Sequence, residues 1–316
     1  MKKKINSILL AFRLKTLPAV LGPLFISISI IIHKNFDLIK IVLIILIGIF
    51  LQILVNLIND LEDSKKGIDN ENRVGPIRAT QSGLLKKLEI KLVIAFILLI
   101  CLILGFIAFI MSGIISIIMG LILMILAYTY TGGPKPYGYI GLGEIAVMLV
   151  FGPFTVLGSL YLFSIYPTFE IILISLIPGL SASLIILVNN IRDCDNDKKS
   201  GKNTIAVKLG EIKSRYLFLG IVITIVMILI YLIFLLQNFL ILIPTFISCY
   251  IFPLKDIGFK KNNFIYWSVD LEKSNKLSQL NSTLLKTVKS HFAICSLLST
   301  SIIIWPYLTD IFENLN

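Results

Sequence analysis

The stretch from residue 38 to residue 65 reads LIKIVLIILIGIFLQILVNLINDLEDSK and indicates the fold class. Its first part is almost purely apolar and is long enough for a helix that crosses a bilayer. Asn56, Asn59, Asp60 and Asp63 end the stretch at spacings of three and four, so they share one helical face. Unpaired carboxylates are costly at the end of such a helix. The stretch therefore predicts a transmembrane helix that presents a carboxylate cluster at one membrane surface.

The composition extends this prediction to the whole chain. Of the 316 residues, 57% are hydrophobic and only 15% are charged, against about 25% charged in an average soluble domain. This composition excludes a soluble enzyme, a disordered protein and a disulfide-rich secreted scaffold. We expect one all-α polytopic membrane domain over residues 1–316. The net charge of +11 indicates cytoplasmic loops against anionic lipid, and no nucleic-acid partner is expected.

Nine apolar runs are long enough to be transmembrane helices. This count divides the continuous stretch 214–254 at Gln237-Asn238; if that stretch were one helix, there would be eight. The runs cover residues 17–32, 38–58, 92–110, 113–131, 139–163, 169–189, 214–236, 238–254 and 291–308. With nine helices and a cytoplasmic N-terminus, 27 of the 29 Lys and Arg residues lie on the cytoplasmic side. The pattern predicts a multi-pass protein of the cell inner (plasma) membrane with an external C-terminus.

A second acidic segment follows the sixth expected helix and reads NNIRDCDNDKKSGKNT over residues 189–204. Asp193 and Asp197 lie four residues apart, and Asn190 lies three residues before Asp193. The acidic loops 56–91 and 189–215 both follow even-numbered helices, so they are expected on the same membrane face. A third cytoplasmic loop, residues 255–290, has no assigned role.

Oxygen ligands without His or Cys favour Mg²⁺, which binds one or two carboxylates together with substrate phosphates. Two facing carboxylate clusters are suited to holding two Mg²⁺ on one diphosphate. The alternative is that the two acidic segments form no metal site and are solvated loops whose charge is incidental. The basic residues near the two segments are candidates to neutralise phosphate oxygens: Arg73, Arg78, Arg192, Lys198 and Lys202.

The segment from Tyr128 to Glu144 admits two interpretations. Its tyrosines, Tyr130 among them, form either an interfacial aromatic belt or part of the wall around a reacting cation and its acceptor. Glu144 is either a carboxylate favoured by a helix N-terminus or a residue of the site, and the sequence does not decide between these roles.

Four segments carry a resemblance to a known family: Leu14–Ala19, Arg73–Arg78, Tyr130–Glu144, and Asn189–Asp193 with Gly201–Thr204. With both acidic motifs, they resemble the UbiA-type intramembrane aromatic prenyltransferases. The resemblance is strongest to the family's 1,4-dihydroxy-2-naphthoate polyprenyltransferase branch, which acts in menaquinone synthesis. It runs from about residue 10 to residue 215. Leu14 departs from the proline usual in that branch, and residues 255–279 match nothing in the family.

The resemblance implies an Mg²⁺-dependent transfer of a polyprenyl group from its diphosphate to an aromatic acceptor, with loss of CO₂ in the naphthoate branch. It implies Asp60, Asp63, Asp193 and Asp197 as metal ligands and catalytic residues. Asn56 and Asn190 are implied to hold metal or diphosphate. The residues implied to bind substrate are Asn56, Arg73, Arg78, Tyr130, Asn190, Arg192, Lys198 and Lys202. Asp195 is not fixed in the family pattern and ranks below Asp193 and Asp197.

Other functions remain open at this point. Within the family, 4-hydroxybenzoate, haem, chlorophyllide or homogentisate are alternative acceptors, and phytyl diphosphate is an alternative donor. In a different class, a cation-coupled transporter also places carboxylates in membrane helices. The positions of the acids at helix ends, and the lack of an evident inverted repeat, argue against a transporter.

Overall fold

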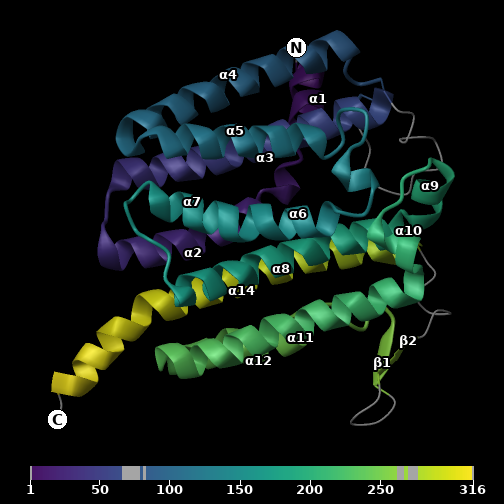
Figure 1. Ribbon diagram of the computed structural model, residues 1–316. Helices are drawn as coiled ribbons and strands as arrows, with labels where there is room; N and C mark the ends of the chain where they lie inside the picture. The colour runs from purple at the N-terminus through teal and green to yellow at the C-terminus, as the bar shows by residue number, and fades with distance from the viewer. Residues whose placement is uncertain (1, 66–78, 81–82, 262–266, 270–276, 315–316) are drawn as a thin grey trace.

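The computed structural model describes residues 2–65, 79–80, 83–261, 267–269 and 277–314. Its helices lie side by side with their long axes in roughly one direction (Figure 1). The first half of the bundle comprises α1 (Lys2–Phe12), η1 (Leu14–Thr16), α2 (Pro18–Lys34), α3 (Leu38–Lys65), α4 (Lys87–Ser112), α5 (Ile114–Thr129), η2 (Tyr137–Tyr139), α6 (Gly143–Leu149), η3 (Val150–Phe154) and α7 (Thr155–Tyr161). The second half comprises α8 (Phe169–Arg192), α9 (Cys194–Lys199), α10 (Ile205–Leu209), α11 (Glu211–Leu236), η4 (Phe239–Ile241), α12 (Leu242–Ile251) and α14 (Leu277–Asn314).

Each expected transmembrane run coincides with a helix or a broken helix. Among the described residues, six helical segments are long and apolar enough to cross a membrane, and the bent pair Asn6–Thr16 and Pro18–Lys34 makes a seventh. The apolar helices Ile114–Thr129 and Phe239–Ile251 are shorter. The expected division between residues 214 and 254 is confirmed, because Gln237 adopts the left-handed conformation (φ 50°) that ends α11. The Asn238 side chain then accepts a hydrogen bond from the Leu240 amide (3.1 Å).

The fifth expected helix is broken rather than continuous. Gly152 and Pro153 interrupt it within η3, a short π-helical segment, and Gly152 has non-helical torsion angles (φ −105°, ψ −106°). A Cβ atom at Gly152 would lie 2.7 Å from the Ser175 carbonyl oxygen of α8. Glycine thus lets the η3 segment cross α8 closely. Pro153 lacks the amide hydrogen that a regular helix uses.

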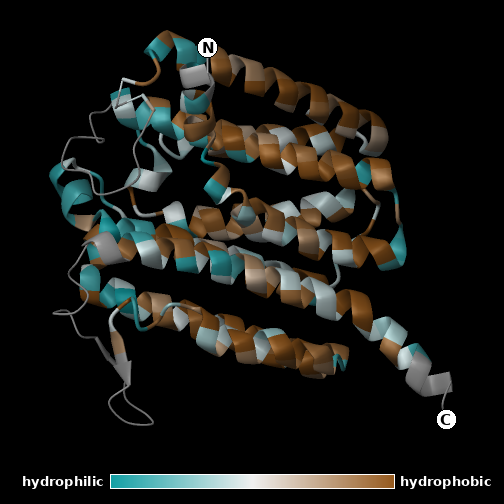
Figure 2. Ribbon diagram, turned by 180° about the vertical axis from the view of Figure 1, so that it is seen from behind, coloured by the Kyte–Doolittle hydropathy of each residue, from teal (hydrophilic) through white to brown (hydrophobic). Residues whose placement is uncertain are grey.

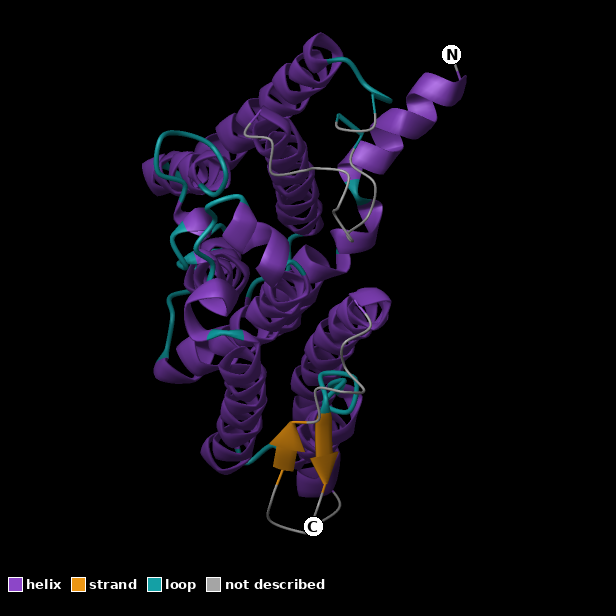
Figure 3. Cartoon of the chain, turned by 90° about the vertical axis from the view of Figure 1, so that its right-hand side faces the viewer, coloured by secondary structure: helices purple, strands orange, loops and turns teal. Residues whose placement is uncertain are grey.

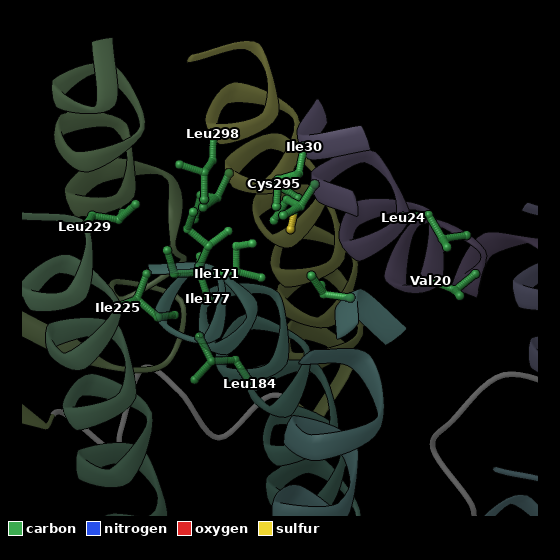
Figure 4. Close-up of a cluster of buried hydrophobic side chains, with 14 of the residues drawn as sticks. Val20, Leu24, Ile30, Ile171, Ile177, Leu184, Ile225, Leu229, Cys295 and Leu298 are labelled. Carbon is green, nitrogen blue, oxygen red and sulfur yellow. The ribbon is translucent and has the colours of Figure 1, made fainter. Parts of the chain in front are cut away.

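The larger of two hydrophobic clusters lies mainly among α2, α8, α11 and α14, as Figure 4 shows for Leu24, Ile177, Ile225 and Leu298, and the smaller one lies among α1, α3 and α4. A polar contact lies within the larger cluster. The buried His291 of α14 bonds through Nε2 to the Ala19 carbonyl oxygen (3.0 Å) and through Nδ1 to Ser181 Oγ (2.7 Å). One imidazole therefore joins three helices and is fully hydrogen-bonded, as burial of a polar group requires.

Hydrophilic residues gather at the end of the bundle where α9 and α10 lie, and the helix bodies are mostly hydrophobic (Figure 2). Figure 3 looks onto this polar end, where the loops and a two-stranded ribbon lie. Strands β1 (Phe259–Lys261) and β2 (Trp267–Val269) pair antiparallel, with Phe259 opposite Val269. The C-terminus lies at the opposite end (Figure 1). The all-α expectation is thus confirmed apart from this short ribbon.

The three expected loops contain more helix than the sequence indicates. α3 continues through Lys65, α8 ends only at Arg192, and α9 and α10 occupy much of residues 194–209. The predicted loop 255–290 holds the ribbon, and its last residues form the start of α14, which begins at Leu277. Thr283, Thr287 and Ser290 are buried there, and Thr287 and Ser290 return hydroxyl hydrogen bonds to carbonyls one turn earlier (2.8 and 2.9 Å). The buried face mixes these hydroxyl residues with the apolar Leu280 and Val288, so it lacks the continuous hydrophobicity that marks the run 291–308, and the prediction of a loop was wrong for this reason.

Candidate active site

The first acidic motif forms about the last three turns of α3. Asn56, Asp60 and Asp63 recur at four and three residues on one face, and all three are buried. Asn56 Nδ2 donates to the Phe12 carbonyl oxygen (3.1 Å) and to Thr16 Oγ1 (3.0 Å), so it connects α3 to the first bend of the chain. The shared face predicted from the spacing is confirmed, and it points into the protein instead of toward solvent.

The second acidic motif lies at the junction of α8 and α9. The buried Arg192 donates from Nε and Nη2 to the two carboxylate oxygens of Asp193 (2.8 and 2.6 Å), which forms a forked ion pair. The same guanidinium donates to Asn189 Oδ1 (2.7 Å) and to Asn281 Oδ1 of α14 (3.0 Å). All three nitrogens of the Arg192 guanidinium therefore donate hydrogen bonds within or beside this motif and fix the position of Asp193.

Lys202 connects the second motif to the first. Its ammonium lies 3.7 Å from Asp197 Oδ1 and 5.1 Å from the centre of the Tyr139 ring. The Tyr139 hydroxyl in turn donates to Asp63 Oδ1 (2.5 Å). A continuous path of side chains thus runs from Asp197 through Lys202 and Tyr139 to Asp63. The two motifs, more than 120 residues apart in the chain, meet at the polar end of the bundle.

The loop between α5 and α6 holds the two motifs together. On the side of the first motif, Thr131 donates to Asn59 Oδ1 (2.8 Å). On the other side, the Asn203 amide donates to the Tyr139 carbonyl oxygen and Lys208 Nζ to the Ile140 carbonyl oxygen (2.8 and 2.5 Å). Gly141 has a positive φ of 80°, which glycine adopts without strain. The glycine-rich sequence here was a usable signal for a turn of this kind.

Glu144 and Tyr130, at the two ends of the segment that joins α5 to α6, lie near the place where the two Asp motifs meet. Glu144, in the first turn of α6, is buried and accepts a hydrogen bond from Asn190 Nδ2 (2.8 Å). The hydroxyl of Tyr130 lies within electrostatic reach of Glu144, Asp63 and Asp197. The sequence leaves the role of Glu144 undecided, and the structure places it directly against the second motif.

A cavity of about 930 Å³ extends from this point into the bundle. Its polar wall includes Asn56, Asp63, Tyr130 and Lys202. Further polar residues line it, Arg13 and Lys15 among them, but most of the remaining lining is apolar or small and comes from α1 to α8 and α14, reaching Leu162 near the opposite end. A long apolar cavity with polar groups at one end suits an amphiphilic ligand with a charged head.

The other candidates lie elsewhere. Lys198 and Asp195 are exposed on α9, away from the buried carboxylates. Arg73 and Arg78 lie outside the described residues. The Cys194 thiol has a raised pKa because of burial and the carboxylates of Asp195 and Asp197, so it stays protonated at neutral pH. Within the described ranges, no group of three or more His, Cys, Asp and Glu side chains is arranged for one metal ion.

The oxygen chemistry of the site is nevertheless suited to a divalent cation shared with a phosphate. Asp60, Asp63 and Asp197 are 1%, 3% and 2% exposed, and a concentration of buried carboxylates is costly without cations. Carboxylate and amide oxygens are also the ligands that Mg²⁺ takes in proteins. The side chains present therefore fit this metal.

Comparison with known proteins identifies the family. The model of the UbiA prenyltransferase family matches residues 20–263. This chain belongs to the UbiA prenyltransferase family. Together with its apolar helices, this membership shows a multi-pass membrane protein.

Relatives with assigned names are similar over most of the chain. A 1,4-dihydroxy-2-naphthoate octaprenyltransferase of Haemophilus influenzae is 38% identical over 227 residues, which cover 68% of this chain and 74% of the relative. The enzyme of the same name from Escherichia coli is 36% identical over 219 residues, which cover 65% and 69%. A UbiA homologue of Archaeoglobus fulgidus, solved with DMAPP and Mg²⁺, has the same fold, with a TM-score of 0.64, 16% identity, and coverage of 92% of this chain and 99% of that one.

Proposed function

We propose that this chain transfers a polyprenyl group from a prenyl diphosphate to 1,4-dihydroxy-2-naphthoate, with release of diphosphate and CO₂ and formation of the quinol, the reduced form of demethylmenaquinone. The observation that carries the proposal is the meeting of two buried Asp motifs at the mouth of a long apolar cavity. The names of the two bacterial relatives support the naphthoate as acceptor.

The donor is expected to lie with its diphosphate among the acidic residues and its chain in the apolar cavity. Asp60, Asp63, Asp193 and Asp197 would hold Mg²⁺, with Asn56 and Asn190 supporting the metal or the diphosphate. When bound, Mg²⁺ would neutralise the charge of the departing diphosphate. The solved relative that binds DMAPP and Mg²⁺ is consistent with this assignment.

The protein's own cations add to this neutralisation. Lys202 lines the cavity beside Asp197, where its ammonium can pair with a phosphate oxygen. Arg192 fixes Asp193, and we assign Arg73 and Arg78 to the diphosphate or the acceptor carboxylate. Lys198 was a candidate for the same role, and its exposure makes it a peripheral contributor.

The reaction balances without any further reactant. The bond between the allylic carbon and the diphosphate oxygen breaks, and its electron pair leaves with diphosphate. The ring carbon that bears the carboxylate forms the new carbon–carbon bond. The carboxylate then leaves as CO₂, and its bonding electrons restore the aromatic ring. Tyr130 and the apolar cavity walls exclude water, which would otherwise capture the reactive allylic group.

The test is an acceptor panel with the purified protein, Mg²⁺ and one radiolabelled prenyl diphosphate. We expect prenylated product and released CO₂ with 1,4-dihydroxy-2-naphthoate, and far less product with 4-hydroxybenzoate. Prenylation of 4-hydroxybenzoate with its carboxylate retained, and no reaction of the naphthoate, would overturn the acceptor assignment. Absence of transfer to every acceptor, with cation-dependent solute uptake in vesicles, would indicate a transporter.

We also propose a single domain over residues 1–316 with nine membrane crossings in the cell inner (plasma) membrane, a cytoplasmic N-terminus and an external C-terminus. The charge distribution supports this topology, since 27 of 29 Lys and Arg residues then face the cytoplasm. The position of the C-terminus opposite the polar end agrees with an odd number of crossings (Figure 1). Reporter fusions after residues 75, 200 and 270 should be cytoplasmic, and a fusion after residue 313 should be external. A cytoplasmic reporter at 313 would exclude nine crossings.

A further inference from the structure

Glu144 is a buried carboxylate whose place in the fold is not explained by helix formation alone. It is 4% exposed, and its Oε1 accepts the hydrogen bond from Asn190 Nδ2. Its Oε2 is also buried, and no partner for this atom is found among the described residues. A carboxylate oxygen buried without a partner lowers stability. A carboxylate that served only the α6 N-terminus would not need this position.

The contact restricts the orientation of the Asn190 amide. An ionised carboxylate only accepts hydrogen bonds, so the NH₂ group of Asn190 must face Glu144. The amide oxygen, Oδ1, then faces away from Glu144. Asn190 lies in the last turn of α8, three residues before Asp193, which joins α8 to α9.

The charge around Glu144 connects it to the meeting point of the two motifs. Lys202, which lies beside Asp197, attracts Glu144 electrostatically. The Tyr130 hydroxyl lies within electrostatic reach of Glu144, Asp63 and Asp197. Any change in the orientation of the Asn190 amide would therefore be felt at the position where the proposed function places the cation and the diphosphate.

We propose that Glu144 is a positioning residue that fixes the Asn190 amide, so that Asn190 Oδ1 is presented as an oxygen ligand to the cation and diphosphate between the two Asp motifs. The proposal rests on the proposed function for the identity of this ligand. A buried residue that orients a metal ligand typically changes metal affinity or activity by about 10- to 100-fold when it is replaced.

The decisive variant is Glu144→Gln, because it separates orientation from packing. Glutamine keeps the volume and still pairs with Asn190, but its amide accepts either orientation of the Asn190 side chain. The readout is Mn²⁺ binding to the purified protein with geranyl diphosphate present, followed by the electron paramagnetic resonance signal of free Mn²⁺. We expect Mn²⁺ affinity to fall by about tenfold or more, with the temperature of unfolding unchanged.

A swapped pair provides the rescue. Asn190→Asp alone would place two carboxylates in contact, which forces one to be protonated. In the double variant Glu144→Gln with Asn190→Asp, the introduced glutamine amide can donate to one carboxylate oxygen at position 190 and leave the other oxygen for the cation. We expect this double variant to bind Mn²⁺ more tightly than Asn190→Asp alone.

Glu170→Gln is the matched control. Glu170 also lies in the first turn of a helix, α8, as Glu144 does in α6, so it shares any benefit from a helix N-terminus. Its replacement should leave Mn²⁺ affinity unchanged. Wild-type affinity in Glu144→Gln, or no recovery in the swapped pair, would overturn the proposal. Mn²⁺ binding that depends on Glu144 without transfer to any aromatic acceptor would overturn the proposed function and leave this inference standing.

Discussion

The two Asp motifs are similar in sequence and are held in different ways. In the first motif, Asp63 accepts from the neutral hydroxyl of Tyr139, and Asn59 accepts from Thr131. In the second motif, Asp193 is paired with the buried guanidinium of Arg192, and Asp197 lies beside the ammonium of Lys202. Two basic side chains thus contact the Asp residues of the second motif directly. A cation bound at the second motif must therefore compete with Arg192 for Asp193.

The largest expected effects come from replacing one Asp in each motif. Asp63→Asn and Asp193→Asn should each lower prenyl transfer by about 10²- to 10³-fold, as expected for loss of a group that stabilises developing charge. Their effects on stability should differ. Asp193→Asn leaves the fully buried Arg192 side chain without its counter-ion and should cost about 3 kcal/mol, near the lower end for a broken buried pair, because Asn189 and Asn281 still accept.

Turnover of labelled prenyl diphosphate and thermal unfolding in detergent measure the two effects. Asp63→Asn should lower the unfolding temperature less than Asp193→Asn, since its side-chain oxygen still accepts from Tyr139. An equal loss of stability in both variants would show that the two motifs are held alike.

The next effect concerns the lysines of the second motif. Lys202→Ala should raise KM for the prenyl diphosphate by about tenfold, because a hydrogen bond to a charged group contributes about 1.5 kcal/mol. Lys198→Ala is the matched control, since Lys198 is exposed on α9, and its KM should stay within about twofold of wild type. Initial rates at varied donor concentration test both variants. Equal effects would remove the distinction between the lysines.

Tyr139→Phe tests the neutral contact of the first motif. The variant loses the hydroxyl that donates to Asp63 but keeps the ring beside Lys202. We expect kcat to fall by about fivefold, which corresponds to about 1 kcal/mol for one hydrogen bond. If Tyr139→Phe were as inactive as Asp63→Asn, the hydroxyl would have a direct part in the reaction.

Asp195→Ala should have the smallest effect. Asp195 lies between the two Asp residues of the second motif in sequence, but its side chain is exposed on α9. Its removal should leave both turnover and unfolding within about 0.5 kcal/mol of wild type. A loss comparable with that of Asp193→Asn would mean that the second motif binds through a different face of α9.

The helices whose buried faces are apolar could be predicted from the sequence. The helix break at Gln237-Asn238 and the helical face of Asn56, Asp60 and Asp63 follow from local patterns that the structure confirms. The start of α14 was not predicted, because its buried face mixes Thr283, Thr287 and Ser290 with only a few apolar residues and does not form a continuous hydrophobic run. The helix break at Gly152 depends on close contact with α8, which cannot be predicted from the residues around Gly152.

A helical membrane protein with two acidic motifs at helix ends follows from the amino-acid sequence alone, since apolar run length and the spacing of polar residues are local properties. The partners of the residues in these motifs depend on how the helices pack: Tyr139 for Asp63, Glu144 for Asn190, and Asn281 for Arg192. These pairs are 76, 46 and 89 residues apart in the chain. Helical periodicity specifies which face of a helix is buried, whereas the element that covers this face is chosen by the packing of the whole bundle.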